Sequence, residues 1–234
     1  MQKNNFFQIA IDGPVAAGKG TVAKMLAAKL HFLYVDTGAM YRAAGLLAQQ
    51  NGMEIKPENQ EKIAEKLETA EFHLENSLDE NDNLITLVSL NGEDVSDEIR
   101  TQKVSEAASQ VATLPLVRQV LVKKQQKIAE KFNVVMEGRD IGLRVLPNAH
   151  LKLYLTADLE ERARRRLAQN QKIGETVDLE AVKKQIEERD YLDTHREADP
   201  LTIVPDAIVL DTTNLAIEAV VNNIVGLVQI HQDV

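Results

Sequence analysis

The chain of 234 residues contains no cysteine and no tryptophan. Without cysteine it can form no disulfide bond, no thiolate nucleophile and no metal centre that depends on cysteine ligands. The five histidines, at positions 31, 73, 150, 195 and 231, show none of the spacings of a metal site. We therefore expect other residue types to carry the chemistry, and the lack of cysteine fits a reducing compartment.

Long hydrophobic runs are missing as well. No stretch approaches the ~20 apolar residues of a membrane-spanning helix, and residues 1–13 lack the apolar core of a signal peptide. The C-terminal segment 215–230 is interrupted by Glu218, Asn222 and Asn223, which favours a helix packed on a core. These features predict a cytoplasmic protein without a membrane partner.

The chain has few positive charges relative to negative ones. It contains 27 lysines and arginines and 36 aspartates and glutamates, which gives a net charge of −9. Such a chain is a poor general binder of nucleic acid, so we expect no nucleic-acid partner. Any anionic ligand must meet locally placed arginines and lysines. Hydrophobic residues make up 44% of the chain, enough for a core in one α/β domain with insertions, or in two small domains at most.

The first 50 residues have the pattern of a βαβ unit. An apolar strand is expected at 6–11, a helix at 20–30, a second buried strand at 32–36 and a helix at 39–50. This succession indicates a parallel sheet. Further apolar strands are expected at 134–138, 151–156 and 207–212.

The pattern changes after residue 50. A helix near 57–69, strands at 71–76 and 83–90 and a turn at 91–94 predict a small antiparallel insertion. Helices are then expected at 101–113 and 116–132, and two highly charged helices at 159–171 and 179–192, joined by residues 172–178. Asp158 and Glu161 have the spacing of a capping box at the start of the first charged helix.

Residues 13–21, GPVAAGKGT, have the spacing of a phosphate-binding P-loop between an expected strand and an expected helix. The glycines let backbone N–H groups turn toward an anion, and Lys19 adds a mobile positive charge. A glycine-rich turn without a ligand is the alternative, but the context strongly favours phosphate binding. The residues expected to bind the nucleotide cofactor are Gly13, Pro14, Val15, Ala16, Ala17, Gly18, Lys19, Gly20 and Thr21.

The loop departs from the usual pattern directly after the lysine. Many P-loops place Ser or Thr there to hold Mg²⁺, but here that residue is Gly20, and the hydroxyl follows on Thr21. Because Mg²⁺ dehydrates reluctantly, we expect it to be held mainly by ATP phosphates and water, with no dedicated protein ligand. Thr21 is then expected to contact phosphate.

The segment VDTGAMYR (35–42) ends the second expected strand. Ligands of open α/β sheets bind beyond the carboxyl ends of the strands, so Thr37 and Arg42 are candidate ligand contacts. The alternative is that Thr37 is only a helix N-cap and Arg42 only a surface residue.

The segment EGRDIG (137–142) also follows an apolar strand. Glu137 could be an acid near Mg²⁺, as in other P-loop enzymes. Arg139 and Asp140 could bind a ligand, or they could simply pair with each other as structural charges.

The two charged helices offer further candidates. Arg162 and Arg166 lie four residues apart with Arg165 beside them, and such a run is more often a solvated helix face. Beside a P-loop, however, these cations could clamp a transferred phosphate. In the second helix region, the spacing of Arg189, Asp193 and Arg196 predicts one shared face.

These segments together resemble the bacterial-type cytidylate kinases, within the nucleoside monophosphate kinases. The resemblance runs from IAIDGPVAAGKGT through DTGAMYR, VSDEIRTQKVSEAASQVATLPLVR, EGRDIG and ERARRR to ERDYLDTHREADPL, and so covers nearly the whole chain. GKGT in place of GK[ST] is shared across nucleoside monophosphate kinases. Two positions depart from many relatives, which have Thr where Leu143 stands and Asp where Glu137 stands.

The resemblance implies an α/β P-loop NTPase fold of three layers, with a central parallel sheet, an acceptor insertion that contains a small antiparallel sheet, and a helical lid. The core would comprise about 1–36, 114–157 and 200–234, the acceptor region about 37–113 and the lid about 158–195. The implied activity is ATP-dependent phosphorylation of CMP and dCMP by direct in-line transfer, in pyrimidine nucleotide metabolism. We expect a cytoplasmic monomer.

The resemblance also assigns site residues. The pyrimidine pocket would fall on Thr37, Arg118, Asp140 and Arg196, and the sugar contacts on Ser109, Arg189 and Asp193. Arg42 and Arg139 would bind the acceptor phosphate. The cations that act in catalysis would be Lys19, Arg162, Arg165 and Arg166.

Such an acceptor needs no general base, because a phosphate monoester with a second pKa near ~6 is mostly dianionic at neutral pH. Catalysis would then be positioning and charge neutralisation with water excluded. One alternative is a P-loop kinase for UMP, AMP or an alcohol, and an alcohol would need a deprotonating carboxylate beside the loop. Another is a GTPase-type switch, but the guanine-reading tetrapeptide Asn-Lys-x-Asp is absent.

Overall fold

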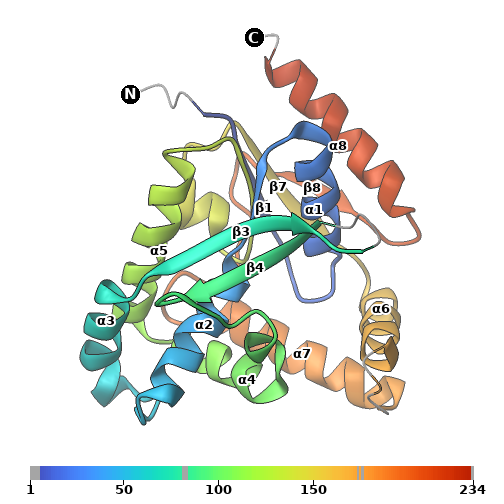
Figure 1. The fold of residues 1–234 in the computed structure, drawn as a ribbon. Helices are drawn as coiled ribbons and strands as arrows, with labels where there is room; N and C mark the ends of the chain where they lie inside the picture. The colour runs from blue at the N-terminus through green and yellow to red at the C-terminus, as the bar shows by residue number, and fades with distance from the viewer. Residues whose placement is uncertain (1–5, 81–83, 173, 175–176, 233–234) are drawn as a thin grey trace.

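The computed structural model describes residues 6–80, 84–172, 174 and 177–232 (Figure 1). Its central layer is a five-stranded sheet with the order β2-β6-β1-β7-β8, in which every neighbouring pair is parallel. The strands are β1 (Gln8–Asp12), β2 (Leu33–Asp36), β6 (Val134–Glu137), β7 (Leu151–Thr156) and β8 (Ile208–Asp211). The order places β1, and therefore the loop after it, in the middle of the sheet.

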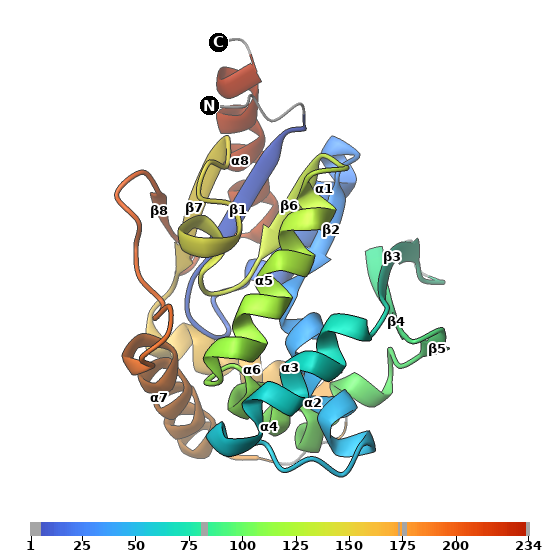
Figure 2. The same ribbon diagram turned by 90° about the vertical axis from the view of Figure 1, so that its left-hand side faces the viewer.

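Helices cover both faces of this sheet (Figure 2). Successive side chains of a strand point to opposite faces, so Ile9 and Ile11 pack in one hydrophobic cluster and Ala10 in another. The first cluster includes α1 (Lys19–Leu30) and α8 (Ile217–Gln232). The second includes α5 (Pro115–Ala129) and a π-turn at Ile141–Val145. The expected three-layer α/β fold is therefore confirmed.

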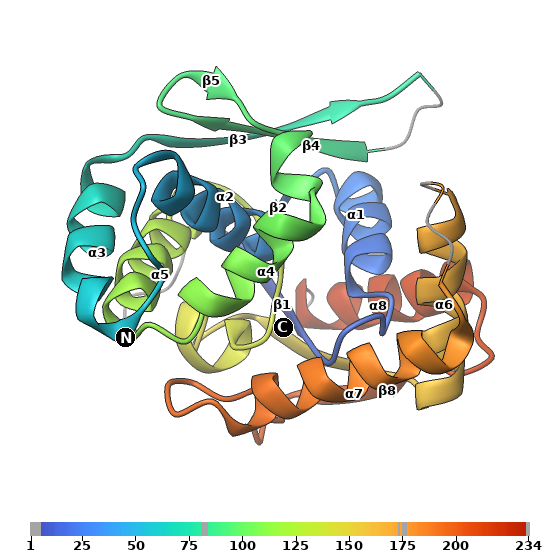
Figure 3. The same ribbon diagram turned by 90° about the horizontal axis from the view of Figure 1, so that it is seen from below.

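The segment between β2 and α5 forms the expected insertion. It contains α2 (Thr37–Gln50), α3 (Gln60–Thr69) after a 3₁₀ turn at Pro57–Asn59, and α4 (Gln102–Val111) after another at Glu98–Arg100. A separate antiparallel sheet has the order β3-β4-β5, with β3 (Phe72–Leu78), β4 (Leu84–Leu90) and β5 (Glu93–Asp94). Figure 3 shows this sheet on one side of the molecule and α7 on the other.

The small sheet of the insertion is joined to the central sheet through the side chain of Asn76. The Asn76 amide accepts a hydrogen bond from the Tyr34 backbone N–H at 2.7 Å and donates one to the Tyr34 carbonyl at 3.0 Å. Tyr34 lies on β2, which is an edge strand of the central sheet. The Asn76 side chain therefore pairs with β2 as a neighbouring strand would.

The charged segment forms α6 (Leu159–Lys172) and α7 (Leu179–His195), which pack through Ala163, Val182 and Ile186. Asp158 accepts a hydrogen bond from the Glu161 N–H at 2.6 Å, which is half of the expected capping box. Part of the expected connection, at 173 and 175–176, lies outside the described residues. Within the described ranges, no helix has the length and apolar character needed to cross a membrane.

Three local features differ from the sequence analysis. The N-cap of α2 is Asp36, whose carboxylate accepts from the Ala39 N–H at 3.0 Å, and not Thr37, which is the first residue of the helix. The expected turn at 91–94 contains β5. The π-turn was not expected, because the carboxylate that stabilises it comes from Asp12, far away in the sequence.

Candidate active site

The P-loop joins β1 to α1 in a conformation that requires glycine. A Cβ on Gly13 would lie 2.0 Å from the Leu155 carbonyl oxygen, and Gly18 has a φ of +86° at the N-terminus of α1. Lys19 is the first residue of the helix, and its Nζ donates to the Pro14 carbonyl at 2.7 Å. The loop therefore curves around the positive end of α1, where an anion is favoured.

The helix pair α6–α7 contacts the backbone of this loop. Arg162 donates from Nη1 to the Val15 carbonyl at 3.2 Å and pairs with Asp190 of α7. Asp190 in turn accepts from the Val15 N–H at 3.2 Å. Both helices are thus anchored at one P-loop residue.

Arg165 and Arg166 of α6 differ in their surroundings. Arg165 pairs with Glu161 at 2.9 Å and donates to the Thr212 carbonyl at 2.7 Å, beside the end of β8. Arg166 is exposed, and within the described residues it forms no ion pair or hydrogen bond. Arg166 therefore is the arginine of this run whose cation is free to bind a ligand.

A cavity of about 270 Å³ opens between the P-loop, α6 and the start of α8. Its apolar lining comes from Val22, Leu215, Ile217 and Val220, and Arg165 and Lys172 stand at its polar side. A larger groove of about 660 Å³ lies between the end of α3 and β3, away from the loop. The smaller cavity adjoins the phosphate-binding loop, whereas no residue of the loop lines the larger one.

A second group of charged side chains lies where β2 and β6 end, facing the P-loop. Arg42 pairs with Asp36 at 2.8 Å, and Arg139 pairs with Asp193 of α7 at 2.7 Å. The Thr37 hydroxyl donates to the Glu137 carbonyl at 2.8 Å, which ties α2 to β6. Thr37 and Arg42 therefore are not isolated surface residues.

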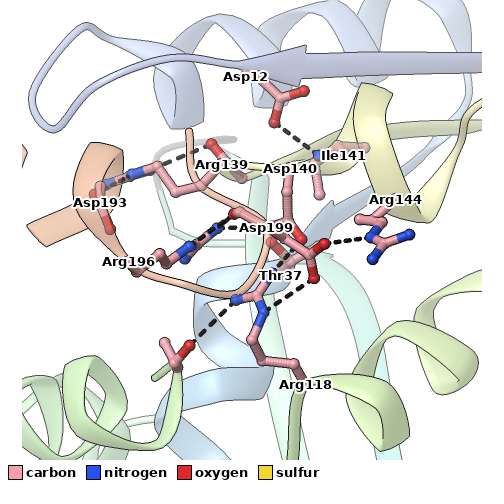
Figure 4. Close-up of polar contacts among 12 residues, drawn as sticks. Asp12, Thr37, Arg118, Arg139, Asp140, Ile141, Arg144, Asp193, Arg196 and Asp199 are labelled. Atoms are coloured by element: carbon pink, nitrogen blue, oxygen red, sulfur yellow. Dashed lines mark hydrogen bonds and ion pairs between the residues drawn. The ribbon is translucent and has the colours of Figure 1, made fainter. Parts of the chain in front are cut away.

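Asp140 lies in a buried ion-pair network (Figure 4). It pairs with Arg118 and, at 3.5 Å, with Arg196. Arg118 is only 1% exposed and also pairs through Nε with Asp199 at 3.3 Å. Asp199 further pairs with Arg144.

The alternative that Arg139 and Asp140 pair with each other was wrong. The two residues lie in the bend after strand β6, with Gly138 between the strand and Arg139. Arg139 pairs with Asp193 of α7, whereas Asp140 pairs with Arg118 of α5.

Burial and charge shift the ionisation of this site. Burial raises the pKa of Asp12 to about 6, although two backbone N–H groups stabilise its carboxylate. Burial also raises the pKa of Asp140, against the opposing effect of Arg118 and Arg196. For Asp193, burial raises the pKa, but Arg139, Arg189 and Arg196 together outweigh it, and the net pKa lies below the usual value.

The cations of the site are crowded. Burial and the charge of Arg139 lower the pKa of Lys19, and the same two causes lower the pKa of Arg189. An anion that binds beside these cations stabilises their charged forms. The site therefore favours an anionic ligand such as phosphate.

The structure does not bring every expected residue into this network. Ser109 lies on α4, and its hydroxyl donates to the Ser105 carbonyl of the same helix at 3.2 Å. Leu143 lies on the π-turn and is 39% exposed.

The residues that sequence reasoning missed are Asp12, Asp36, Tyr41, Asp190 and Asp199. Tyr41 lies beneath Arg118, with the guanidinium 5.7 Å from the ring centroid, and its buried hydroxyl has no partner within the described part of the chain. Asp36 and Tyr41 lie within the VDTGAMYR segment and could have been found there. Asp190 and Asp199 gave no local signal, because their partners are distant in sequence.

A P-loop after the central strand of a parallel sheet, with helices on both faces and an arginine-rich site opposite the loop, defines the class of P-loop kinases. Comparison with known proteins narrows this class to one family. The family model described as cytidylate kinase matches residues 9–230, and the chain belongs to this family and is a phosphotransferase.

Individual proteins similar to this chain are also cytidylate kinases. A cytidylate kinase of Leuconostoc mesenteroides subsp. mesenteroides is 47% identical over 223 residues, which cover 95% of this chain and 96% of the relative. One of Bacillus thuringiensis is 48% identical over 220 residues, 94% of this chain and 95% of the relative. Among solved structures, an uncharacterized protein from Eubacterium ventriosum has a TM-score of 0.51 at 11% identity, with 95% of this chain and 98% of that chain covered. This last similarity concerns the fold alone.

Proposed function

We propose that this chain transfers the γ-phosphoryl group of ATP directly to the phosphate of CMP or dCMP. The observation that carries the proposal is the buried network of Arg118, Asp140 and Arg196 at the acceptor site. The names of the relatives, cytidylate kinase, support the same acceptor.

The network offers cytosine complementary hydrogen-bonding groups. An ionised Asp140 can only accept hydrogen bonds, so it suits the N4 amino group of cytosine and faces a lone pair at O4 of uracil. Arg118 can donate to N3 or O2 of cytosine, whereas N3 of uracil carries a proton. Thr37 and Arg196 complete the proposed base pocket.

The acceptor phosphate would be bound by Arg42 and Arg139, which lie at the ends of β2 and β6. Their present partners Asp36 and Asp193 keep these cations oriented until a phosphate replaces part of that pairing. Arg189, Asp193 and Ser109 are the proposed sugar contacts. Because the acceptor oxygen is already ionised, none of these residues has to remove a proton.

The donor phosphates would lie against the P-loop amides, Lys19 and Thr21, with the base in the 270 Å³ cavity. Arg162, Arg165 and Arg166 would surround the moving phosphoryl group when α6–α7 closes over it. The regions proposed to move are the acceptor region at about 37–113 and the lid at about 158–195, against a core of about 1–36, 114–157 and 200–234.

The residues present fit Mg²⁺ bound with ATP. Among the described residues, no group of three or more His, Asp or Glu could enclose a metal ion. The Glu137 carboxylate, however, lies beside Gly20 and has no ion-pair partner in the described part of the chain. One carboxylate together with phosphates and waters is a usual environment for Mg²⁺. When bound, the ion would neutralise charge that develops on the phosphates.

The proposal is tested by measuring ADP release from ATP with CMP, dCMP, UMP, AMP and no acceptor in turn. We expect kcat/KM for CMP and dCMP to exceed that for UMP and AMP by about 10² or more, from two unpaired buried groups of ~1–3 kcal/mol each. Equal turnover of CMP and UMP would contradict the proposal, as would ADP release that needs no acceptor. Light scattering would test the proposed monomer, and cell fractionation the proposed cytoplasmic location.

A further inference from the structure

The segment that follows α7 turns sharply at Asp199. Its φ is +50°, in the left-handed region that residues other than glycine rarely adopt and that aspartate and asparagine tolerate best. The turn folds back on α7, because the Leu201 N–H donates to the Asp193 carbonyl at 2.8 Å. A backbone conformation of this kind persists only where the surrounding contacts stabilise it.

The backbone carbonyl of Asp199 holds one guanidinium. It accepts hydrogen bonds from both Nε and Nη2 of Arg196, the first at 2.7 Å. Arg196 is the C-cap of α7, its side chain is 8% exposed, and its Nη2 lies 3.5 Å from Asp140 Oδ1. The left-handed turn at Asp199 therefore determines where the guanidinium of Arg196 lies.

The carboxylate of Asp199 holds a second guanidinium (Figure 4). Its Oδ2 accepts from Arg118 Nε at 3.3 Å, and its Oδ1 pairs with Arg144. Arg118 also donates from Nη1 to the Ala112 carbonyl at 3.4 Å and from Nη2 to Asp140. Each nitrogen of this guanidinium thus has an acceptor in the protein, and Nη1 and Nη2 each keep a second hydrogen for a ligand.

Arg144 joins Asp199 to the turn that follows Asp140. It lies in the π-turn Ile141–Val145, and its backbone N–H donates to the Asp140 carbonyl at 2.8 Å. Asp140, Arg118, Asp199 and Arg144 therefore form a closed ring of contacts. Without the Asp199 carboxylate, Arg118 and Arg196 would share the carboxylate of Asp140 and repel each other.

We propose that Asp199 is a positioning residue that determines base specificity, because it fixes Arg118 through its carboxylate and Arg196 through its backbone carbonyl. These are the two guanidiniums that the proposed function places at the base, and the inference rests on that function. Arg144 acts through Asp199, since it holds the same carboxylate from the solvent side.

Loss of this positioning has an effect that loss of stability alone does not have. A fixed Arg118 donates toward the ring of the base, where N3 of cytosine accepts and N3 of uracil carries a proton. A loosened Arg118 contacts cytosine less well and turns away from uracil, so the two substrates become more alike. The proposed phosphate contacts, Arg42 and Arg139, are common to both substrates and stay in place.

The first experiment measures ADP release with CMP and with UMP in Asp199→Asn. This variant keeps the size of the side chain and its tolerance of the left-handed conformation, and removes only the charge. We expect KM for CMP to rise and the CMP:UMP ratio of kcat/KM to narrow, each by about tenfold, as for loss of a charge-assisted hydrogen bond. We expect kcat at saturating CMP and KM for ATP to stay within about twofold of wild type. An unchanged ratio, or an equal loss with both substrates, overturns the proposal.

Asp206→Asn is the matched control in the same connection between α7 and β8. Asp206 pairs with Lys152 at 2.8 Å, and the Lys152 side chain is 8% exposed. Removal of this carboxylate should lower Tm and leave the CMP:UMP ratio unchanged. If Asp206→Asn narrows the ratio as much as Asp199→Asn does, general loosening of the connection explains the effect, and the proposal is overturned.

Arg144→Ala is a second variant whose folding is secure, because the Arg144 side chain is 60% exposed. We expect it to narrow the ratio by about threefold alone and to add nothing in the double variant with Asp199→Asn, since it acts through that carboxylate. An additive effect in the double variant overturns this role of Arg144. If Asp199→Asn does not fold, an unchanged ratio in Arg144→Ala overturns the proposal by itself.

Asp199→Ala tests the contact with Arg196. Alanine removes the carboxylate and also disfavours the left-handed turn, so both guanidiniums should be released and the ratio should narrow further than in Asp199→Asn. Equal narrowing in the two variants overturns the part of the proposal that concerns Arg196. Wild type that turns over CMP and UMP equally contradicts the proposed function, whereas wild type and Asp199 variants that share one preference for CMP contradict only this inference.

Discussion

Asp140→Asn is the substitution that most directly separates base recognition from structural support. The asparagine keeps the size of the side chain, but its amide can present either a donor or an acceptor to the base. It also leaves Arg118, which is 1% exposed, with Asp199 as its remaining carboxylate partner. We therefore expect effects on both specificity and stability.

The magnitudes follow from the burial of the pair. Loss of a hydrogen bond to a charged group costs ~1.5–3 kcal/mol, so kcat/KM for CMP should fall by a factor of about 10 to 150. UMP gains an amide donor opposite O4, so its kcat/KM should stay constant or rise, and the CMP:UMP ratio should narrow by about 10². Removal of one partner from a buried ion pair lowers the free energy of unfolding by ~3–5 kcal/mol. Because Asp199 still pairs with Arg118, we expect a loss of ~3 kcal/mol.

The assay is ADP release with CMP and with UMP, together with the free energy of unfolding in urea. Asp97→Asn is the matched control, because Asp97 is fully exposed and lies 4.0 Å from its partner Arg100. It should leave the CMP:UMP ratio of kcat/KM unchanged. The free energy of unfolding should change by no more than about 0.5 kcal/mol. If Asp140→Asn lowers both substrates by the same factor, Asp140 acts only as a structural partner of Arg118, and the base is read elsewhere.

Three further predictions concern other parts of the site. Arg42→Ala should raise KM for CMP by about tenfold or more and leave KM for ATP unchanged, because Arg42 is proposed to bind the acceptor phosphate. Gly13→Ala should lower the free energy of unfolding by about 3 kcal/mol or more, since its Cβ would lie 2.0 Å from a carbonyl oxygen, whereas Gly52→Ala, with φ +64° and open space, should cost about 1 kcal/mol. Asp12 has a pKa raised from 3.8 to about 6 in the folded state, so its contribution to stability is complete below pH 3.8 and is lost as pH rises to about 6. Relative to Asp12→Asn, the wild type should therefore lose about 2.4 kcal/mol between pH 4 and pH 7.

Each of these predictions has a result that contradicts it. A rise of both KM values in Arg42→Ala would remove Arg42 from the acceptor site. Equal unfolding free energies for Gly13→Ala and Gly52→Ala would mean that the loop relaxes around a new methyl group. A stability difference between wild type and Asp12→Asn that does not vary with pH would show that Asp12 titrates normally.

Local signals predicted the strands except β5, most helices and the P-loop, because apolar runs and the glycine spacing are contained within a few residues. Thr37 was considered as the N-cap of α2 where the structure has Asp36, because the two residues are adjacent and both suit that position. The network around Asp140 could be anticipated only in part. Arg118 and Arg196 came from a family resemblance, whereas Asp199 and Asp190 pair across long stretches of chain and leave no periodic pattern. Whether the assigned residues bind nucleotide stays a prediction.

The attachment of Asn76 to Tyr34 has a consequence for the edge of the central sheet. In a strand, the N–H and the C=O of one residue point to the same side, and an edge strand offers such groups to any other chain that can pair with them. Asn76 occupies this outward-facing pair on β2, a strand of only four residues. The hairpin β3–β4 therefore prevents β2, at the edge of the central sheet, from pairing with a strand of another molecule. A variant that lacks this hairpin would expose the edge of β2. It would need a proline or a charged side chain at that edge to avoid aggregation.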